Sequence, residues 1–307
     1  PRTLTMEMAA ALGEGGVTRA SLGVQSFDPV VQKAINRIQS EETTAAAVGA
    51  LRRNGIGGIN FDLIYGLPHQ TVASCRETVR AAIALRPDRF AVFGYAHIPS
   101  FKKHQRLIDE NALPDAQARH EQAEAIAEAL VAAGYGRIGL DHFALPEDEL
   151  AIAAANGQLR RNFQGYTTDN CDALLGFGAS SIGRVAEGYV QNEVPPGSYA
   201  RKVSSGELPT AKGYRLTRED RLRAHVIERL MCDFAADIPA IAAAHGFSPD
   251  MLLGPNQRLR DMAEDGLISL ENGMIRLDGA YRFLVRTVAA TFDSYLADSQ
   301  RTFSKAA

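Results

Sequence analysis

The chain has 307 residues, of which 46% are hydrophobic and 22% are charged, and its formal net charge is -3 at pH 7. This composition is ordinary for a globular protein with one large domain and a smaller one. It gives no electrostatic reason to expect nucleic acid or a membrane as a partner, and no apolar run is long enough to span a bilayer. The first residues lack the basic start and apolar stretch of a signal peptide. Because the chain starts with Pro1 in the middle of a pattern, we expect it to be a fragment of a longer protein.

The cysteines, Cys75, Cys171 and Cys232, are far apart and odd in number. They form neither a disulfide framework nor a C-x-x-C metal motif. We therefore expect free thiols in the reducing cytoplasm and no metal ligands in this chain.

Strands and helices alternate along the first half of the chain. Apolar runs bounded by turn residues predict strands at 20–27, 58–68 and 89–99. Capping residues and helical spacing predict the intervening helices. Such alternation is typical of a parallel sheet built from β–α units. The predicted helices span 3–14, a short stretch from Pro29, 41–53, 74–85 and 115–133.

Three further elements and a linker are expected before the C-terminal region. The sequence predicts a fourth strand at 136–144, a helix at 147–156 and a glycine-rich strand at 173–183. Gly- and Pro-bearing sequence around 191–215 is typical of a linker.

The segment 216–307 has a different character. Thr217 caps a long predicted helix, Asn272–Gly273 predicts a type I′ hairpin, and a last helix is expected at 280–297. Helices with a hairpin suggest a winged-helix-like module. Its third helix carries Arg258 and Arg260, which neighbouring acidic residues offset, so a structural or lid role is favoured over DNA binding.

Polar or small residues end the predicted strands. They are Gln25, Asp62, Ala96–His97 and Asp141–His142. Because ligands bind where the strands of a β–α sheet end, this arrangement indicates an enzyme.

The residues alone leave two interpretations open for Asp62 and Gln25. A carboxylate inside an apolar strand needs partners, which either ligand hydroxyls or an ion pair with an arginine, for example Arg37, would supply. The Gln25 amide could bind a ligand or cap a neighbouring backbone.

Two other groups are ambiguous as well. His97 and His142 with Asp141 could bind a metal, but the absence of metal-ligand spacing within one element favours contact with an acidic substrate. In the loop 160–170, Arg160 and Arg161 could pair with substrate carboxylates or form a solvated basic turn.

Several motifs together resemble the oxygen-independent coproporphyrinogen III oxidases, radical S-adenosylmethionine (SAM) enzymes of haem biosynthesis. The matching segments, in family order, are SLGVQSF, NRIQ, NFDLIYGLPHQT, GYAHIP, GLDHFALPEDELAIA, LRRNFQGYTT and LLGFGASSIG. The resemblance implies an α/β fold, a partial (β/α) barrel that here lacks its first strands. It also implies domain limits of 1–190 for the barrel part, 191–215 for the linker and 216–307 for the winged-helix-like domain.

The resemblance further implies a radical oxidative decarboxylation of coproporphyrinogen III to protoporphyrinogen IX. Two SAM molecules and a 4Fe–4S cluster take part, with a flavodoxin-type electron donor and a monomeric protein. The family's contacts to the second SAM fall on Gln25, Arg37, Asp62 and Ala96, and one contact to the first falls on Ile182. No residue is assigned to the catalytic step.

One departure from the family pattern limits these expectations. The cluster motif C-x-x-x-C-x-x-C is absent from this chain, and three thiolates are needed to hold the cluster. We therefore expect this fragment to be inactive alone and the full-length protein to be the oxidase. The alternative is a haem-binding chaperone of the same superfamily without oxidase activity, although RNFQGYTT favours the enzyme.

Overall fold

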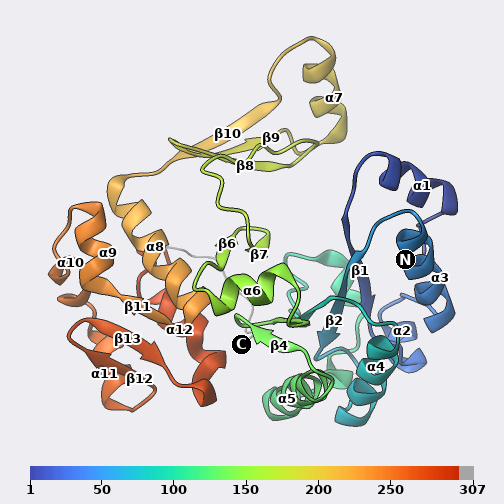
Figure 1. The fold of residues 1–307 in the computed structure, drawn as a ribbon, viewed down its shortest axis with the longest axis horizontal. Coiled ribbons are helices and arrows are strands. Elements are labelled where there is room, and N and C mark those ends of the chain that lie inside the picture. The colour runs from blue at the N-terminus through green and yellow to red at the C-terminus, as the bar shows by residue number, and fades with distance from the viewer. Residues whose placement is uncertain (297–307) are drawn as a thin grey trace. The chain divides into compact units, whose positions relative to one another are not determined.

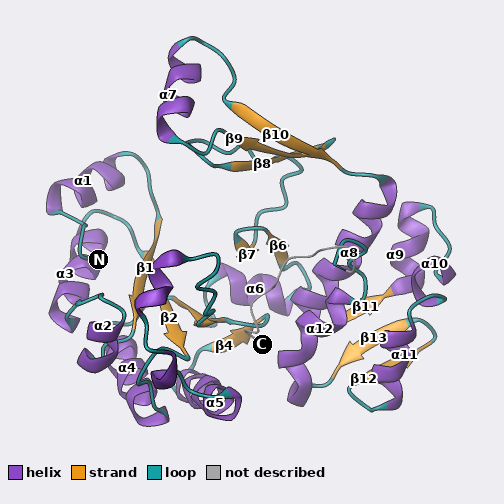
Figure 2. Ribbon diagram, turned by 180° about the vertical axis from the view of Figure 1, so that it is seen from behind, coloured by secondary structure: helices purple, strands orange, loops and turns teal. Residues whose placement is uncertain are grey.

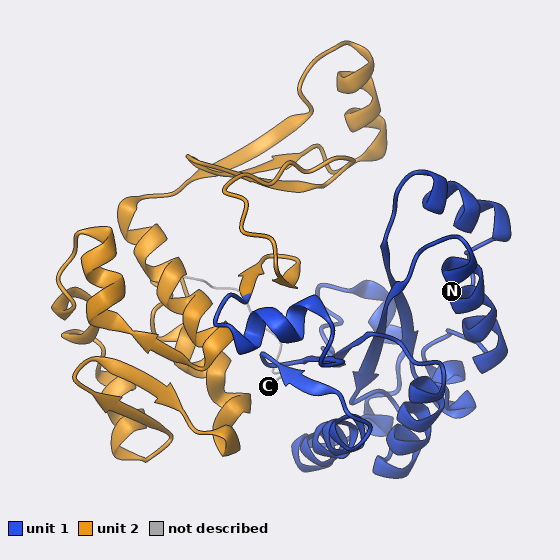
Figure 3. Cartoon of the chain, in the orientation of Figure 1, with its two compact units in different colours: residues 1–159, 299–307 blue, residues 160–298 orange. Residues whose placement is uncertain are grey.

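The computed structural model describes residues 1–296, which divide into two compact units (Figure 3). Unit 1 comprises residues 1–159, and unit 2 begins at Arg160. Within the described residues, no helix is both long enough and apolar enough to cross a membrane.

Unit 1 is built on a five-stranded sheet with the strand order β1-β2-β3-β5-β4. β1 is parallel to β2 and β2 is parallel to β3, whereas β5 is antiparallel to both of its neighbours. The three parallel strands confirm the predicted alternation of strands and helices. The strands are β1 (Arg19–Gln25), β2 (Gly58–Tyr65), β3 (Arg89–Gly94), β4 (Gly136–Ile138) and β5 (His142–Ala144).

The helices of unit 1 begin at capping residues. Asp28 accepts hydrogen bonds from the N–H groups of Val30 and Val31, and Pro29 occupies the first turn that follows, as expected from the sequence. The helices are α1 (Met6–Glu14), α2 (Pro29–Ala34), α3 (Glu41–Arg53), α4 (Val72–Ala84), α5 (Ala116–Ala132) and α6 (Glu149–Ala155), with 3₁₀ turns η1 (Lys103–Leu107) and η2 (Glu110–Ala112).

The core of unit 1 lies on one face of the sheet. Successive side chains of a strand point to opposite faces, so Phe61 and Leu63 of β2 are buried while Asp62 between them is half-buried. Phe61 and Leu63 belong to the same cluster as Leu51 of α3 and Val79 of α4. Both views show α3 and α4 on one side of β1 and β2 (Figures 1 and 2). The opposite face of the sheet carries the polar side chains.

Residues 136–144 do not form the single strand predicted from the sequence. They form the hairpin β4–β5, which reverses near Gly139, where φ is 57°. Asp141 and His142 therefore lie at the start of a strand and not at its end. Because β5 is antiparallel to β3, this start still lies at the carboxyl edge of the parallel strands, where Asp141 O accepts a 2.7 Å hydrogen bond from Val92 N.

Unit 2 begins with the hairpin β6–β7 and a three-stranded antiparallel sheet, β10-β9-β8. The predicted strand at 173–183 is wrong, because only a bridge between Leu174 and Arg184 and the start of β8 have strand pairing there. Gly178, with φ 100°, lies in a conformation that a regular strand cannot continue. The strands are β6 (Arg160–Asn162), β7 (Gly165–Thr167), β8 (Ile182–Val185), β9 (Gly188–Asn192) and β10 (Thr210–Arg215).

The segment 191–215, expected to be a linker, contains α7 (Pro196–Ser204) and β10, which pairs with β9. Every residue of β10 is exposed, so no alternation of apolar and polar residues marks it as a strand. The domain limits 1–190, 191–215 and 216–307 stay a prediction.

The rest of unit 2 combines helices with a second three-stranded sheet, β11-β13-β12, consistent with a winged-helix-like module. Asn272 and Gly273 have φ values of 51° and 78°, as a type I′ turn requires. The last predicted helix, 280–297, is wrong in its bounds, because a 3₁₀ turn occupies its start and the α-helix ends at Ala290; only residue 297 lies outside the described residues. The elements are α8 (Arg218–Asp233), β11 (Ala235–Asp237), α9 (Ile238–His245), α10 (Asp250–Leu253), α11 (Gln257–Glu264), β12 (Ile268–Glu271), β13 (Met274–Leu277), η3 (Gly279–Leu284) and α12 (Val285–Ala290).

Candidate functional site

Three of the predicted site residues gather around Gly23 on the polar face of unit 1. A Cβ atom placed on Gly23 would lie 2.7 Å from Nε2 of Gln25 and 3.0 Å from Nη2 of Arg37. The same Arg37 nitrogen donates a 2.8 Å hydrogen bond to the carbonyl oxygen of Gly23. Gly23 is also the strand partner of Asp62. The structure thus brings together Gln25, Arg37 and Asp62, which lie far apart in sequence.

The end of β1 departs from regular strand geometry. The register between β1 and β2 shifts between Gly23 and Gln25, and Gln25 has φ 67°, in the left-handed region. An irregularity of this kind redirects a side chain, and both bulges and positive φ values at residues other than glycine concentrate at functional sites.

Asp62 has neutral partners on its polar face. The Ser21 hydroxyl lies 3.0 and 3.1 Å from its two carboxylate oxygens, and Asn60 Nδ2 donates to Oδ1 at 2.8 Å. No ion pair joins Asp62 to Arg37 within the described residues, so the ion-pair interpretation of Asp62 is wrong. Because each carboxylate oxygen can accept more than one hydrogen bond, Asp62 retains capacity for ligand hydroxyls.

Four buried polar atoms near this point lack a hydrogen-bond partner. In the described part of the chain they are Gln25 Oε1, Arg37 Nε, Gln39 Oε1 and Asn60 Oδ1. Burial lowers the pKa of the Arg37 guanidinium, Arg2 lowers it further, and Asp62 opposes both. An unsatisfied buried group costs about 1–3 kcal/mol, so their concentration here indicates a place where a polar ligand completes the hydrogen bonding.

Ala96 follows β3 in a segment that a buried glutamine holds. Gln105 Nε2 donates to the carbonyl of Ala96 at 2.9 Å, and Gln105 Oε1 accepts from the N–H of Ile98 at 2.6 Å. The Ala96 backbone therefore has a fixed orientation at the edge where the strands end.

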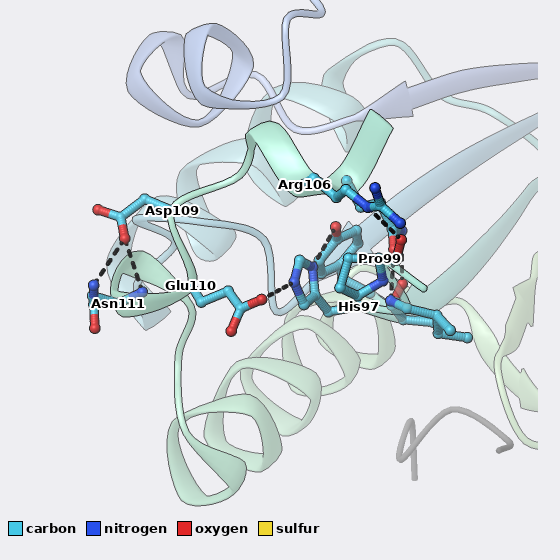
Figure 4. Close-up of polar contacts among 10 residues, drawn as sticks. His97, Pro99, Arg106, Asp109, Glu110 and Asn111 are labelled. Atoms are coloured by element: carbon cyan, nitrogen blue, oxygen red, sulfur yellow. Dashed lines mark hydrogen bonds and ion pairs between the residues drawn. The ribbon is translucent and has the colours of Figure 1, made fainter. Parts of the chain in front are cut away.

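The two histidines have separate environments. His97 lies between the Tyr95 hydroxyl, 3.1 Å from Nδ1, and a Glu110 carboxylate oxygen, 3.0 Å from Nε2 (Figure 4). His142 Nδ1 lies 2.7 Å from an oxygen of Asp141. Among residues 1–296, no group of three or more potential ligands is arranged to hold a metal ion.

The remaining predicted residues belong to unit 2. Ile182 begins β8 with 36% of its surface exposed, and its joining a site with the unit 1 residues stays a prediction. Arg160 and Arg161 lie in β6 and are both half-buried, which does not fit a fully solvated turn.

Sequence reasoning missed Ser21, Gly23, Asn60, Gln39 and Gln105. A signal for the first three is present in the sequence. Ser21 and Gly23 are two residues apart on β1, as are Asn60 and Asp62 on β2, so the period of a strand places each pair on one face. Gln39 lies in a loop and Gln105 in the short 3₁₀ turn η1, where periodicity gives no information.

Comparisons with known proteins match two regions of the chain to family models. The family model described as the Radical SAM superfamily matches residues 1–82, and the one described as the HemN C-terminal domain matches residues 216–284. A protein of Bradyrhizobium diazoefficiens named oxygen-independent coproporphyrinogen III oxidase is 59% identical over 306 residues, which are 100% of this chain and 68% of that protein. A protein of Cereibacter sphaeroides with the same name is 44% identical over 93% of this chain and 63% of its own length.

A solved structure of a relative has the same fold as this chain. Coproporphyrinogen III oxidase (HemN) of Escherichia coli, described as a radical SAM enzyme, matches with a TM-score of 0.90 and 37% identity. The match covers 96% of this chain and 68% of the solved chain. The chain therefore spans about two thirds of the length of these relatives. It belongs to the oxygen-independent coproporphyrinogen III oxidase family of radical SAM proteins.

Proposed function

We propose that the protein to which these residues belong converts coproporphyrinogen III to protoporphyrinogen IX by oxygen-independent oxidative decarboxylation in haem biosynthesis. The relatives' names supply the reaction. The single observation from this chain that supports it is the gathering of Gln25, Arg37 and Asp62 around Gly23 with unsatisfied buried polar atoms.

The residues around Gly23 fit SAM in chemical type. The Asp62 carboxylate and the Gln25 amide accept hydrogen bonds of the kind that ribose hydroxyls donate, and Arg37 can pair with the carboxylate of the methionine part. The Ala96 backbone offers a further contact, since Gln105 holds it in place. When bound and reduced, SAM supplies a 5′-deoxyadenosyl radical. We assign these four residues to the second of two SAM molecules, and Ile182 to the adenine of the first.

The residues of this chain do not fit the family's 4Fe–4S cluster. Such a cluster needs three thiolates close together, whereas Cys75 lies in α4, Cys171 in a loop and Cys232 in α8. Cys75 and Cys232 are buried. We therefore expect these 307 residues alone to show no oxidase activity. Adding iron and sulfide to them anaerobically should give no spectrum of a SAM-cleaving cluster.

We further propose a flavodoxin-type electron donor, a monomeric state and a cytoplasmic location, where a reducing environment keeps the thiols free. We expect no binding to a membrane or to nucleic acid. In the winged-helix-like region, Arg260 donates hydrogen bonds to the carbonyls of Leu253 and Gly254, so this guanidinium serves the fold and not a basic surface.

The decisive experiment is an anaerobic assay of the full-length protein with SAM, a low-potential reductant and coproporphyrinogen III. Protoporphyrinogen IX and 5′-deoxyadenosine should both accumulate. Asp62→Ala should weaken SAM binding by about tenfold or more, because it removes a charged acceptor. The exposed Asp265→Ala is the matched control and should behave as wild type. Stoichiometric haem binding without turnover would support the chaperone alternative instead.

A further inference from the structure

Unit 2 contains a cavity that the proposed SAM site does not use. Its volume is about 290 Å³, and it lies among the hairpin β6–β7, the loop that follows it, β8, β9 and α8. Its lining includes side chains with apolar surface, such as Tyr189 and Ile227, and three arginines. A mostly apolar pocket with a few convergent charged groups is the usual form of a small-molecule site.

The two carboxylates of this cavity already have partners. Glu228 Oε1 lies 3.2 Å from Nε of Arg160 and accepts a 3.0 Å hydrogen bond from the N–H of Arg161. Asp169 accepts a 2.8 Å hydrogen bond from the N–H of Cys171. Hydrogen bonds from the side chain and the N–H of Cys171 are the main causes that lower the pKa of Asp169. The positive charge of Arg184 lowers it by a smaller amount.

Arg161 is left without a counterion. Among residues 1–296 it forms no ion pair with a carboxylate, and its Nε is buried without an acceptor. Its guanidinium carbon lies 5.6 Å from the centre of the Tyr166 ring, whose hydroxyl donates to the carbonyl of Met231. The aromatic ring therefore orients the guanidinium and does not neutralise it.

Arg184 adds a second cation at the same cavity. Its Nη2 donates a 2.9 Å hydrogen bond to the carbonyl oxygen of Cys171, which leaves its positive charge uncompensated by that contact. Arg184 and Arg161 both line the cavity. The arginines and the apolar side chains of the lining together suit a ligand that carries an anionic group on an apolar ring.

We propose that this cavity binds the carboxylate of a propionate side chain on a pyrrole ring of the tetrapyrrole, with Arg161 as its main partner. The inference rests on the proposed function, because that function supplies a substrate with propionate groups. A volume of about 290 Å³ is at the lower limit for ligand pockets, so the cavity accepts one ring with its side chain and not the whole macrocycle. The guanidinium binds a planar carboxylate through two parallel hydrogen bonds.

The test measures binding of coproporphyrin III, the stable oxidised form, to the full-length protein by fluorescence. Arg161→Gln should weaken binding by about tenfold or more, and Arg161→Lys should restore part of it. The exposed Arg276→Gln in the same unit is the matched control. Thermal unfolding of each variant checks that the fold is retained.

A second ligand isolates the carboxylate contact. The tetramethyl ester of coproporphyrin III has the same rings without charge, so Arg161→Gln should change its affinity far less than that of the free acid. Equal effects on acid and ester would overturn the proposal, because they would show a structural role for Arg161. A loss of SAM affinity in Arg161→Gln, with unchanged porphyrin affinity, would also overturn it by assigning the carboxylate to SAM.

The experiments distinguish failure of the proposed function from failure of the propionate site. A wild-type protein that forms no protoporphyrinogen IX would contradict the proposed function regardless of any variant. A wild-type protein that does form it, with unchanged porphyrin binding in Arg161→Gln, contradicts only the propionate site.

Discussion

Gly23 determines how much space the polar cluster of unit 1 has. The ends of Gln25 and Arg37 lie where its side chain would be, so only a residue without Cβ leaves both groups in place. Its backbone φ is not in the left-handed region, so the requirement is for space and not for an unusual conformation.

Gly23→Ala should therefore reduce ligand binding more than stability. The added Cβ would displace the flexible ends of Gln25 and Arg37, whereas the backbone can accept alanine. We expect SAM affinity of the full-length protein to fall by about tenfold, in line with the loss of a charged hydrogen bond, with little change in the thermal unfolding midpoint. Equilibrium dialysis with labelled SAM and a melting curve measure the two effects.

Gly57→Ala provides the matched control for this substitution. A Cβ on Gly57 would meet nothing within 4 Å, and this glycine also lacks a left-handed φ. It should leave SAM affinity unchanged. Equal loss of affinity in both variants would refute the role given to Gly23.

Part of this site could be predicted from the sequence. Gln25 and Asp62 stand out because each is polar within an apolar strand, and strand ends are where ligands bind. The bulge at Gln25 and the crowding at Gly23 could not be predicted, because they depend on the register between β1 and β2. Arg37 could be placed only through the family resemblance, since an arginine at a helix end is usually solvated.

Buried glutamines hold the loops at the edge where the parallel strands end. Gln32 fixes the backbone of Ser26 and Gln39 after β1, and Gln70 and Gln122 fix the turn after β2. Side-chain amides can donate and accept at once, so each satisfies backbone groups that a loop leaves unpaired. These hydrogen bonds order the edge in addition to the apolar packing of residues such as Val31 and Leu67.

At the opposite edge of the sheet, the Asp148 carboxylate connects three elements. Its side chain is 2% exposed, and it binds Arg89 Nε at 2.6 Å and Arg19 Nη2 at 2.9 Å. It also accepts from the N–H of Leu150 at the start of α6. Burial lowers the pKa of Arg89, and Asp148 opposes that effect. The Asp148 carboxylate thus compensates the positive charges of arginines on both β1 and β3.

Asp148→Ala should destabilise unit 1 by about 3 kcal/mol, because removing one partner of a buried pair leaves an uncompensated charge. Urea unfolding monitored by circular dichroism measures the change. Glu128→Ala, which breaks an exposed pair with Arg76, should have almost no effect. Equal destabilisation by the two substitutions would contradict the importance of burial.

The hairpin β4–β5 shows why element boundaries were harder to predict than element types. The residues GRIGLDHFA have the composition of one strand, and a single glycine with positive φ divides them. The antiparallel pairing of β5 with β3 depends on contacts distant in sequence, which no local pattern contains. The capped helix α3 has its predicted bounds, whereas α4 begins two residues before its predicted start at residue 74.

Over the whole chain, the three thiols differ strongly in environment. Cys75 belongs to the core of unit 1 and Cys232 to the buried residues of unit 2, and burial raises the pKa of each to about 12. Cys171 is exposed. A hydrogen bond and the negative charge of Asp169 raise its pKa as well.

In the folded 307-residue chain, reaction with a disulfide reagent should therefore modify only Cys171, and after denaturation it should modify Cys75, Cys171 and Cys232. Because the thiolate is the reacting form, the native rate should increase with pH toward the raised pKa of Cys171. Asp169→Asn removes the charge that favours the neutral thiol, so it should lower that pKa and increase the rate at pH 8. Cys171→Ser should abolish the native reaction. A second thiol that reacts equally fast before denaturation would show that the core around Cys75 or Cys232 opens readily, and would contradict this prediction.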